Sequence, residues 1–161
     1  MQSRLVVVRA VLAALLVAAC GSGAQSTANA SPSAPPSSSP AGAATIAVAS
    51  NPKLGQILVD GAGKTLYLFV ADSGSSSTCY TACAQLWPPV LTSGPPQAGT
   101  GANASLLGTT TRTDGKTEVT YGGHPLYYFV SDNQAGDASG QGVDSFGALW
   151  WAVSPSGAAV H

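Results

Sequence analysis

Charged side chains are scarce in this sequence, with six Lys and Arg and seven Asp and Glu among 161 residues, or 8%. So few cations cannot form a basic patch, which argues against nucleic acid as a partner and against anionic lipid bound by charge. The chain also lacks a Gly-x-Ser-x-Gly nucleophile elbow, a zinc-binding histidine pair and a phosphate-binding loop. These absences predict a non-catalytic protein without a metal ion or cofactor.

The apolar run Ala10–Ala19 is too short to span a bilayer, which needs roughly 20 residues. It follows a segment with two arginines, and its last small residues directly precede Cys20. This order is typical of a lipobox, in which the thiol accepts the lipid; the alternative is an ordinary secretory signal that meets a cysteine by chance. We expect residues 1–19 to be a signal peptide and Cys20 to carry the lipid that holds the protein at the outer face of the cell membrane.

Residues 21–44 contain no aromatic and no charged side chain and are rich in Ser, Pro, Ala and Gly. Such a segment cannot bury enough apolar surface to offset the entropy of ordering it. We therefore expect residues 20–44 to form a disordered tether and residues 45–161 to form a single domain. The 19 glycines and 11 prolines, together with the low charge, favour a mainly β fold for that domain.

Short β-branched and aromatic runs alternate with turn signals after residue 45. The predicted strands are residues 57–59, 66–70, 109–112, 117–121 and 125–130. Asp-Gly turns separate the first two strands and the next two, which predicts two hairpins. An antiparallel meander is the simplest arrangement of these strands.

The domain also contains an internal repeat with a shift of 60 residues. The pattern Leu-Tyr-x-Phe-Val-x-Asp begins at Leu66 and again at Leu126, and a Leu-Trp pair follows at Leu86 and at Leu149. We expect two homologous units, about 45–92 and 105–155. Each is too small to be stable alone, so the two should pack as one domain about a pseudo-two-fold axis.

The two repeats differ in the segment that connects the Leu-Tyr-x-Phe-Val-x-Asp pattern to the Leu-Trp pair. In the first, Ser77 and Thr78 are candidate N-caps for a short helix at Cys79–Leu86. In the second, Asn133–Gly147 is rich in Gly, Asp and Ser, which predicts an ordered loop.

The repeated pattern resembles the secreted-repeat lipoproteins, a family described by a Tyr-x-(Phe/Trp/Tyr)-x-x-Asp motif. The matching residues are Tyr67, Phe69 and Asp72, and then Tyr127, Phe129 and Asp132. Cys79-x-x-x-Cys83-Ala84 with Trp87-Pro88-Pro89, and Gly136-Asp137-x-x-Gly140-Gln141-Gly142 with Trp150, are similar to the family's two repeat signatures; Ser145-Phe146 and Trp151 depart from the second. The resemblance implies an exported, often lipid-anchored protein of unknown biochemical role.

The motif itself has a structural interpretation. Along a strand, Leu66, Leu68 and Val70 face one way while Tyr67 and Phe69 face the other, so the strand should be central and covered on both sides. Asp72 and Asp132 follow the motif strands, where a carboxylate can accept hydrogen bonds from loop N–H groups. A ligand-binding or catalytic pair of carboxylates is the alternative.

Cys79 and Cys83 are the thiols that remain once Cys20 is lipidated. Outside the reducing cytoplasm we expect them to form a disulfide, which would stabilise the fold by roughly 2 kcal/mol. A redox-active pair and a metal site are the alternatives, although redox pairs usually have Cys-x-x-Cys spacing.

Two groups of side chains are candidates for ligand contact. The Gly-rich loop has four oxygen-bearing side chains that are candidate calcium ligands: Asp132, Asn133, Asp137 and Asp144. Their spacing does not fit an EF-hand, and solvated turns have the same composition. Tryptophan rings can stack on sugars of a cell-wall glycan or pack in the core: Trp87, Trp150 and Trp151. Adjacent residues on a strand face opposite ways, so of Trp150 and Trp151 one should be buried while the other is a candidate for exposure.

Together these observations predict a lipid-anchored envelope module that binds or scaffolds a partner, such as a glycan or an envelope protein, without catalysing a reaction. An accessory redox or metal-handling protein is the alternative, and a hydrolase with a carboxylate pair would be a third class.

Overall fold

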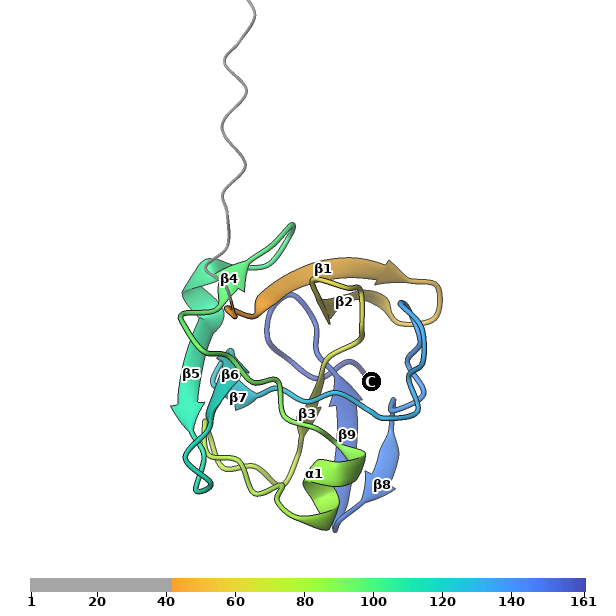
Figure 1. The fold of residues 1–161 in the computed structure, drawn as a ribbon. Coiled ribbons are helices and arrows are strands. Elements are labelled where there is room, and N and C mark those ends of the chain that lie inside the picture. Colours follow the sequence, from red (N-terminus) through yellow and green to blue (C-terminus); the bar gives the residue numbers. More distant parts are fainter. Residues whose placement is uncertain (1–41) are drawn as a thin grey trace, which may run out of the picture. The chain divides into compact units, whose positions relative to one another are not determined.

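The computed structural model describes residues 42–161 (Figure 1), so the predicted signal peptide, Cys20 and most of the predicted tether lie outside the described residues. Over this range the chain forms nine strands, one α-helix and one 3-10 helix. They are β1 (Thr45–Asn51), β2 (Gly55–Asp60), β3 (Tyr67–Phe69), α1 (Ala82–Leu86), β4 (Gln97–Ala98), η1 (Ala104–Leu106), β5 (Leu107–Thr111), β6 (Thr117–Tyr121), β7 (His124–Pro125), β8 (Val143–Ser145) and β9 (Ala148–Ala152). The predicted fold class, mainly β with one short helix, is confirmed. None of the described helices is long and apolar enough to cross a membrane.

The strands form three small sheets with the orders β2-β1-β4, β3-β9-β8 and β5-β6-β7. The hairpins β1–β2 and β5–β6 are antiparallel, and β4 runs parallel to β1. The chain is attached to the domain from Gly42 onward, slightly before the predicted boundary, because the Ser93 N–H donates to the Gly42 carbonyl (3.1 Å) and the Ala44 N–H donates to Thr92 Oγ1 (3.1 Å).

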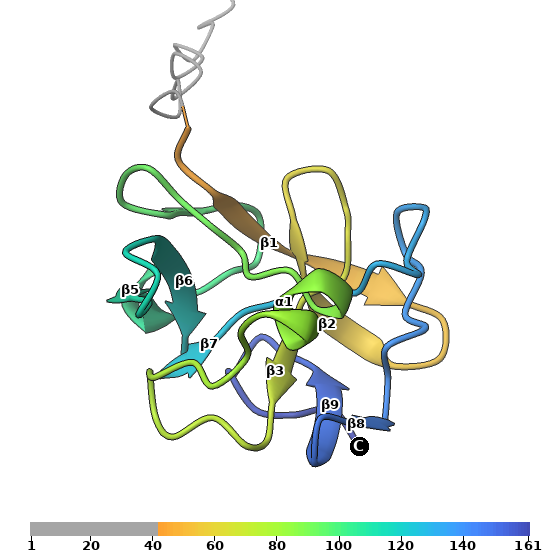
Figure 2. The same ribbon diagram turned by 60° about the horizontal axis from the view of Figure 1, so that its bottom comes forward.

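The predicted antiparallel meander forms only in the second repeat, where β5, β6 and β7 follow one another. In the first repeat, β2 pairs with the residues that precede β3, through the bridge Val59–Thr65 and the bond from the Leu66 N–H to the Leu58 carbonyl (3.0 Å). The ladder partner of β3 itself is β9, more than 75 residues further along the chain. Both ribbon views show β3 beside β9 (Figures 1 and 2).

The predicted strand 125–130 is also mostly absent, since only β7 and two isolated bridges at Tyr127, to Tyr67 and to Pro89, form there. β3 is the end strand of the sheet β3-β9-β8, with only the bridge Tyr67–Tyr127 on its other edge, so the predicted central position is wrong. The prediction that both faces are covered holds for Tyr67, Leu68 and Phe69, which are buried in the two core clusters.

The two repeats exchange partners about a pseudo-two-fold axis. At its centre Tyr67 and Tyr127 exchange both backbone hydrogen bonds, each at 2.9 Å. On either side, each motif segment bonds to the Leu-Trp segment of the other repeat: the Val70 N–H donates to the Leu149 carbonyl (3.0 Å), and the Val130 N–H to the Leu86 carbonyl (3.1 Å). The sheet β3-β9-β8 and these hydrogen bonds combine both repeats, which supports the prediction that the repeats pack as one domain.

The helix of the first repeat is shorter than predicted. It begins after Thr81, which has φ 48° and no side-chain cap, so the predicted start at Cys79 with a Ser77 or Thr78 cap is wrong. Both predicted capping side chains are engaged elsewhere: Thr78 Oγ1 donates to Asp72 Oδ1 (2.8 Å), and Ser77 Oγ is hydrogen bonded to the Tyr127 hydroxyl (2.7 Å). Tertiary hydrogen bonds have taken the side chains that a local capping pattern would use.

The predicted loop Asn133–Gly147 also needs correction, because its last part is the strand β8. β8 and β9 form a hairpin whose two turn residues, Phe146 and Gly147, have positive φ values of 58° and 89°. Two positive φ values are typical of the type I′ turns that join adjacent antiparallel strands. The position that holds α1 in the first repeat is therefore a β-hairpin in the second.

The core consists of two clusters that share β3 as their dividing wall. Tyr67 and Phe69 belong to one cluster, while Leu66 and Leu68 belong to the other, as the alternation predicts. Val70 is the exception: its side chain is 54% exposed, so the prediction that it is covered with its two neighbours is wrong. The chain leaves the sheet at that point.

Candidate functional site

The repeated aromatic residues meet in one stack at the centre of the domain. The Trp87 and Trp150 rings are parallel within 3°, with centroids 4.0 Å apart. Phe129 stacks on the outer face of Trp87 (4.3 Å), and Phe69 stacks on the outer face of Trp150 (4.1 Å). Each phenylalanine therefore packs on the tryptophan of the other repeat, which joins the repeats in the core.

Both tryptophans of the stack have no solvent exposure, so neither presents a ring face to a sugar. Trp151, on the opposite face of β9, is partly buried against the second core cluster and meets His161 edge to face at 4.6 Å. The structure thus places Trp87 and Trp150 in the core, and only Trp151 retains a partly accessible ring.

The motif tyrosines and aspartates form two crossed hydrogen bonds. The Tyr67 hydroxyl donates to Asp132 Oδ2 (2.6 Å), and the Tyr127 hydroxyl donates to Asp72 Oδ2 (2.6 Å). Each tyrosine thus binds the aspartate of the other repeat. The residues that the motif predicts as one local unit act in pairs across the pseudo-two-fold axis.

Further backbone and side-chain donors bind the second oxygen of each carboxylate. Asp132 Oδ1 accepts the Ser139 N–H (2.8 Å), and the Gly140 N–H donates to the Tyr67 hydroxyl (3.2 Å). We call these four residues the Asp132 latch. The prediction that loop N–H groups bind this aspartate is confirmed, and Gly140 fits because a Cβ there would lie 2.8 Å from both Trp87 and Tyr67.

The second site, which we call the Asp72 latch, contains Asp72, Tyr127, Ser77 and Thr78. Asp72 Oδ1 accepts the Thr78 N–H (2.7 Å), which again confirms the predicted loop contact, and the Tyr127 hydroxyl is also bonded to Ser77 Oγ (2.7 Å). Burial raises the pKa of both latch tyrosines above the ordinary value, and the neighbouring carboxylates raise it further. Both tyrosines therefore stay protonated as donors.

The Asp72 latch rests on a buried ion pair. Arg112 Nη1 lies 2.7 Å from Glu118 Oε2, and the same nitrogen donates to Ser77 Oγ (2.8 Å). Both charged side chains are almost completely buried, and within the described residues Arg112 Nε and Glu118 Oε1 have no hydrogen-bond partner. Burial raises the pKa of Glu118 to about 7, although Arg112 lowers it.

The predicted disulfide between Cys79 and Cys83 is confirmed, with the two Cα atoms 5.2 Å apart. Cys79 has no solvent exposure, and its carbonyl accepts a hydrogen bond from Arg112 Nη2 (2.6 Å). Disulfide, ion pair and Asp72 latch are therefore parts of one connected network.

The Gly-rich loop of the second repeat does not gather its oxygen ligands. Asp137 Oδ2 accepts the N–H groups of Asn133 and Gln134, both at 3.0 Å, whereas Asp144 lies exposed on β8. Among the described residues, no group of three or more His, Cys, Asp or Glu side chains is close enough to hold a metal ion.

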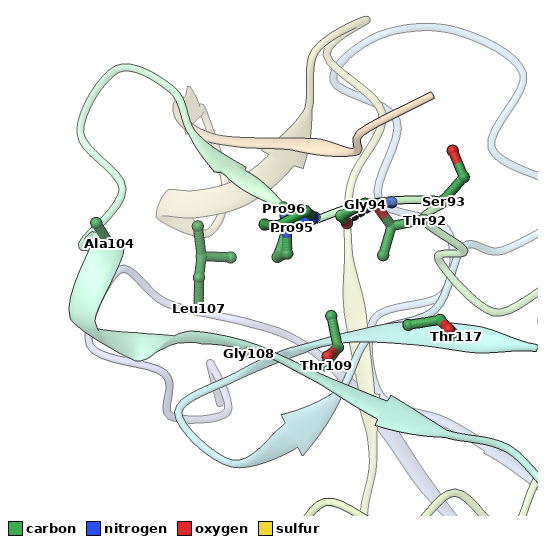
Figure 3. Close-up of a pocket in the computed structure, with 10 residues that line it drawn as sticks. All are labelled: Thr92, Ser93, Gly94, Pro95, Pro96, Ala104, Leu107, Gly108, Thr109 and Thr117. Carbon is green, nitrogen blue, oxygen red and sulfur yellow. Dashed lines mark hydrogen bonds between the residues drawn. The ribbon is translucent and has the colours of Figure 1, made fainter. Parts of the chain in front are cut away.

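A cleft of about 540 Å³ opens between β5 and the segment that leads to β4 (Figure 3). Pro95 and Pro96 lie on one side of it, and Leu107 and Thr109 point into it from the other. Every lining residue is uncharged. They are Thr92, Ser93, Gly94, Pro95, Pro96, Ala104, Leu107, Gly108, Thr109 and Thr117.

The sequence patterns indicated neither this cleft nor the Arg112–Glu118 pair. In a chain with so few charges, opposite charges on either side of a predicted hairpin turn are a usable signal for a pair. The cleft had no such signal, because it combines segments whose proximity depends on tertiary structure.

A family model described as a secreted repeat of unknown function matches residues 48–91 and again residues 108–154. These ranges fall within the two repeats and contain both Tyr-Phe-Asp motifs. No curated protein and no solved structure matches this chain. The chain belongs to the family of secreted repeats of unknown function and carries two copies of the repeat.

Proposed function

We propose that this protein is a lipid-anchored, non-catalytic module that binds or scaffolds a partner at the outer face of the cell membrane. The anchor is the lipid on Cys20, and it is supported by the two arginines, the short apolar run and the small residues that precede this cysteine. A protein with two or three acyl chains on one residue stays stably on the membrane, whereas one chain gives marginal binding.

The crossed latches carry the non-catalytic part of the proposal. Both carboxylate oxygens of Asp132 accept hydrogen bonds from within the domain, and so do both oxygens of Asp72. A general acid or base needs a free position facing its substrate. Here the repeated carboxylates and tyrosines hold the two repeats together, which is a structural role and not a catalytic one.

Binding, in this proposal, takes place at the uncharged cleft. Its walls of proline, threonine and leucine combine apolar surface with a few hydroxyl groups, a composition suited to a neutral partner. It also lies near the point where the chain enters the domain, because Ser93 in its wall donates to the Gly42 carbonyl.

Metabolic labelling with radioactive palmitate tests the anchor. We expect the full chain to incorporate label and to fractionate with membranes, and the Cys20→Ala variant to lose both properties. Ser22→Ala is the matched control, since it changes a neighbouring residue without removing the acyl acceptor. Label in the Cys20→Ala protein, or an unlabelled wild type, would refute the anchor.

An accessory redox protein is the alternative, and the buried Cys79–Cys83 disulfide does not favour it, because thiol–disulfide exchange requires access to sulfur. We expect thiol trapping to show no free cysteine after mild reduction of the folded protein. Ready cycling at physiological potentials would instead favour the redox function.

A further inference from the structure

The hairpins β1–β2 and β5–β6 occupy equivalent positions in the two repeats. The Leu58 N–H donates to the Val153 carbonyl (2.7 Å), and the Val119 N–H donates to the Val90 carbonyl (2.8 Å). Because Leu58 and Val119 make the same cross-repeat bond, they are structurally equivalent. Through the ladders, their partners Val48 on β1 and Thr109 on β5 are equivalent as well. The offset in this hairpin is 61 residues, one more than in the Leu-Tyr motif, because the Leu66 N–H bonds to a carbonyl eight residues earlier and the Leu126 N–H to one seven residues earlier.

In the first repeat the outer edge of β1 is covered by residues 97–100. The Val48 N–H donates to the Thr100 carbonyl (2.8 Å), and the Ile46 carbonyl accepts the Gly99 N–H (2.7 Å). This segment includes β4, which runs parallel to β1. Within this molecule, one edge of this type already accepts an added parallel strand.

In the second repeat the equivalent edge of β5 has no such neighbour among residues 42–161. The bonds Gly122 N–H to Leu106 carbonyl (2.9 Å) and Arg112 N–H to Lys116 carbonyl (2.9 Å) fix the alternation of the β5–β6 ladder. In that alternation the N–H and carbonyl groups of Thr109 and Thr111 point away from β6. β5 is the last strand of its sheet and lies at its outer side in both ribbon views (Figures 1 and 2).

This edge also lacks the features that natural proteins use to block pairing. β5 has the sequence Leu-Gly-Thr-Thr-Thr, without lysine, proline or another charge, and its flanking Arg112 is buried. An exposed, uncharged edge strand is a template for another extended chain.

We propose that the free edge of β5 binds an extended, uncharged peptide segment of a partner protein, which pairs parallel to β5 as residues 97–100 pair with β1. The neutral cleft supports this choice of partner. Leu107 and Thr109 point into the cleft (Figure 3), so every second side chain of an added strand lies on the cleft side of the sheet.

The room at the edge differs between the repeats in a useful way. In the first, a Cβ at Gly99 would lie 3.0 Å from the Ala47 Cβ, so the added segment must have a small residue there. The residue equivalent to Ala47 is Gly108, which has no Cβ. The Ala47 contact is therefore absent at the β5 edge, whereas Thr45, whose Cγ2 would lie 3.2 Å from the same Cβ, has the larger Leu106 as its counterpart.

Amide hydrogen exchange on the lipidated full chain in detergent micelles tests the proposal. The probe is an acetylated and amidated heptapeptide with the sequence of residues 96–102, the chain's own edge segment. We expect the amides of Thr109 and Thr111 to exchange rapidly in the free protein and slowly with the peptide, while inward-facing Thr110 changes little.

A matched pair of variants separates backbone pairing from side-chain contact. Thr109→Pro removes the outward N–H and should weaken peptide binding about tenfold or more, the effect of losing one to two hydrogen bonds. Thr109→Val retains the N–H and should bind as the wild type does. If Thr109→Pro does not fold, a probe N-methylated at alternate residues makes the same test on the wild-type chain and should bind about tenfold more weakly.

Three results would overturn the proposal: no protection of Thr109 and Thr111, equal binding of the N-methylated probe, or protection without peptide. Protection that grows with protein concentration would identify a second copy as the occupant, and protection independent of concentration would identify the chain's own residues 1–41. The inference deepens the proposed binding function but can fail separately from the anchor, because palmitate labelling of Cys20 does not depend on the β5 edge.

Discussion

The Asp72 latch and the Asp132 latch share an equivalent tyrosine–aspartate bond, but their other members and their surroundings differ. Beneath the Asp72 latch lies the buried Arg112–Glu118 pair. The equivalent of Arg112 in the first repeat is Asn51, whose Nδ2 donates to the Gly136 carbonyl (3.0 Å) in the loop of the Asp132 latch. A guanidinium and an amide thus perform the same task, which is to hold the loop that contains the aspartate.

The motif therefore determines the tyrosine–aspartate hydrogen bond of each latch but not how its loop is supported. The first-repeat loop is supported by a disulfide and a buried ion pair. The second-repeat loop is supported by the Asn51 amide and by two charged groups that are not buried, Lys64 Nζ on the Asp132 carbonyl and the Asp137 carboxylate on loop N–H groups. The Asp72 side should therefore depend on pH and on single charges more strongly than the Asp132 side.

Arg112→Met should have the largest effect on stability. It leaves Glu118 buried without a partner, and breaking a buried pair in this way costs about 3–5 kcal/mol. Asn51→Ala, the equivalent change on the other side, should cost about 1–3 kcal/mol, since it leaves only neutral groups unpaired. Urea denaturation monitored by tryptophan fluorescence measures both.

The double variant Arg112→Met/Glu118→Leu serves as the control for Arg112→Met. Removing both charges should restore most of the lost stability, because the cost comes from the isolated carboxylate. If Arg112→Met were no more damaging than Asn51→Ala, the two supports would be energetically equivalent and the contrast would fail.

The next effect is a pH dependence that arises from Glu118 on the Asp72 side. The pKa of Glu118 is raised by burial to about 7 in the folded state, above its ordinary value of 4.5. Between these values the folded protein holds a proton that the unfolded chain has lost, so stability falls as pH rises. The expected loss is about 3 kcal/mol between pH 4.5 and 7, with little further change above.

Denaturation midpoints measured across this range check the prediction. Glu118→Gln should remove the slope, since it removes the group that titrates. A wild-type stability that increases from pH 5 to 7 would contradict the assigned direction.

Removing single hydroxyl groups compares the two latches directly. Tyr67→Phe should cost about 2 kcal/mol, because it removes one donor from the buried carboxylate of Asp132. Tyr127→Phe should cost about 1 kcal/mol, since Asp72 is only partly buried and water can replace the donor. Equilibrium unfolding of the two variants under one set of conditions gives the order, and the reverse order would show that the Ser77 contact outweighs burial.

Short sequence patterns predicted the features of the fold that depend on residues close together in the chain. Residues 117–121 form a strand with the predicted boundaries, and the Cys79–Cys83 disulfide forms as predicted for the two thiols that remain in an exported chain. The pairing of β3 with β9 was not predictable in this way, because it depends on contacts between distant segments. The helix start was predicted wrongly because Ser77 and Thr78 bind the distant Tyr127 and the nearby Asp72 instead of the helix N-terminus.

The same limit applies to the candidate site. The internal repeat identified Tyr67, Asp132 and their counterparts as candidate residues. The crossing of the two pairs could not be seen, because a repeat indicates which residues are equivalent but not which copy each one contacts.

The smallest effect concerns the part of the repeats that differs most, α1 in one and the β8–β9 hairpin in the other. Phe146 at the hairpin turn has φ 58° and a 48% exposed side chain, so it is unfavourable for both backbone and solvation. Asn-Gly is the preferred pair in a type I′ turn, and Phe146→Asn should therefore raise stability by about 0.5–1 kcal/mol. Thermal unfolding measures the change, with Phe146→Ala as a control that removes the ring without adding the asparagine preference. A destabilised Phe146→Asn protein would mean that packing of the exposed ring outweighs its backbone strain. The turn would then be a point where the second repeat has an interaction that the first lacks.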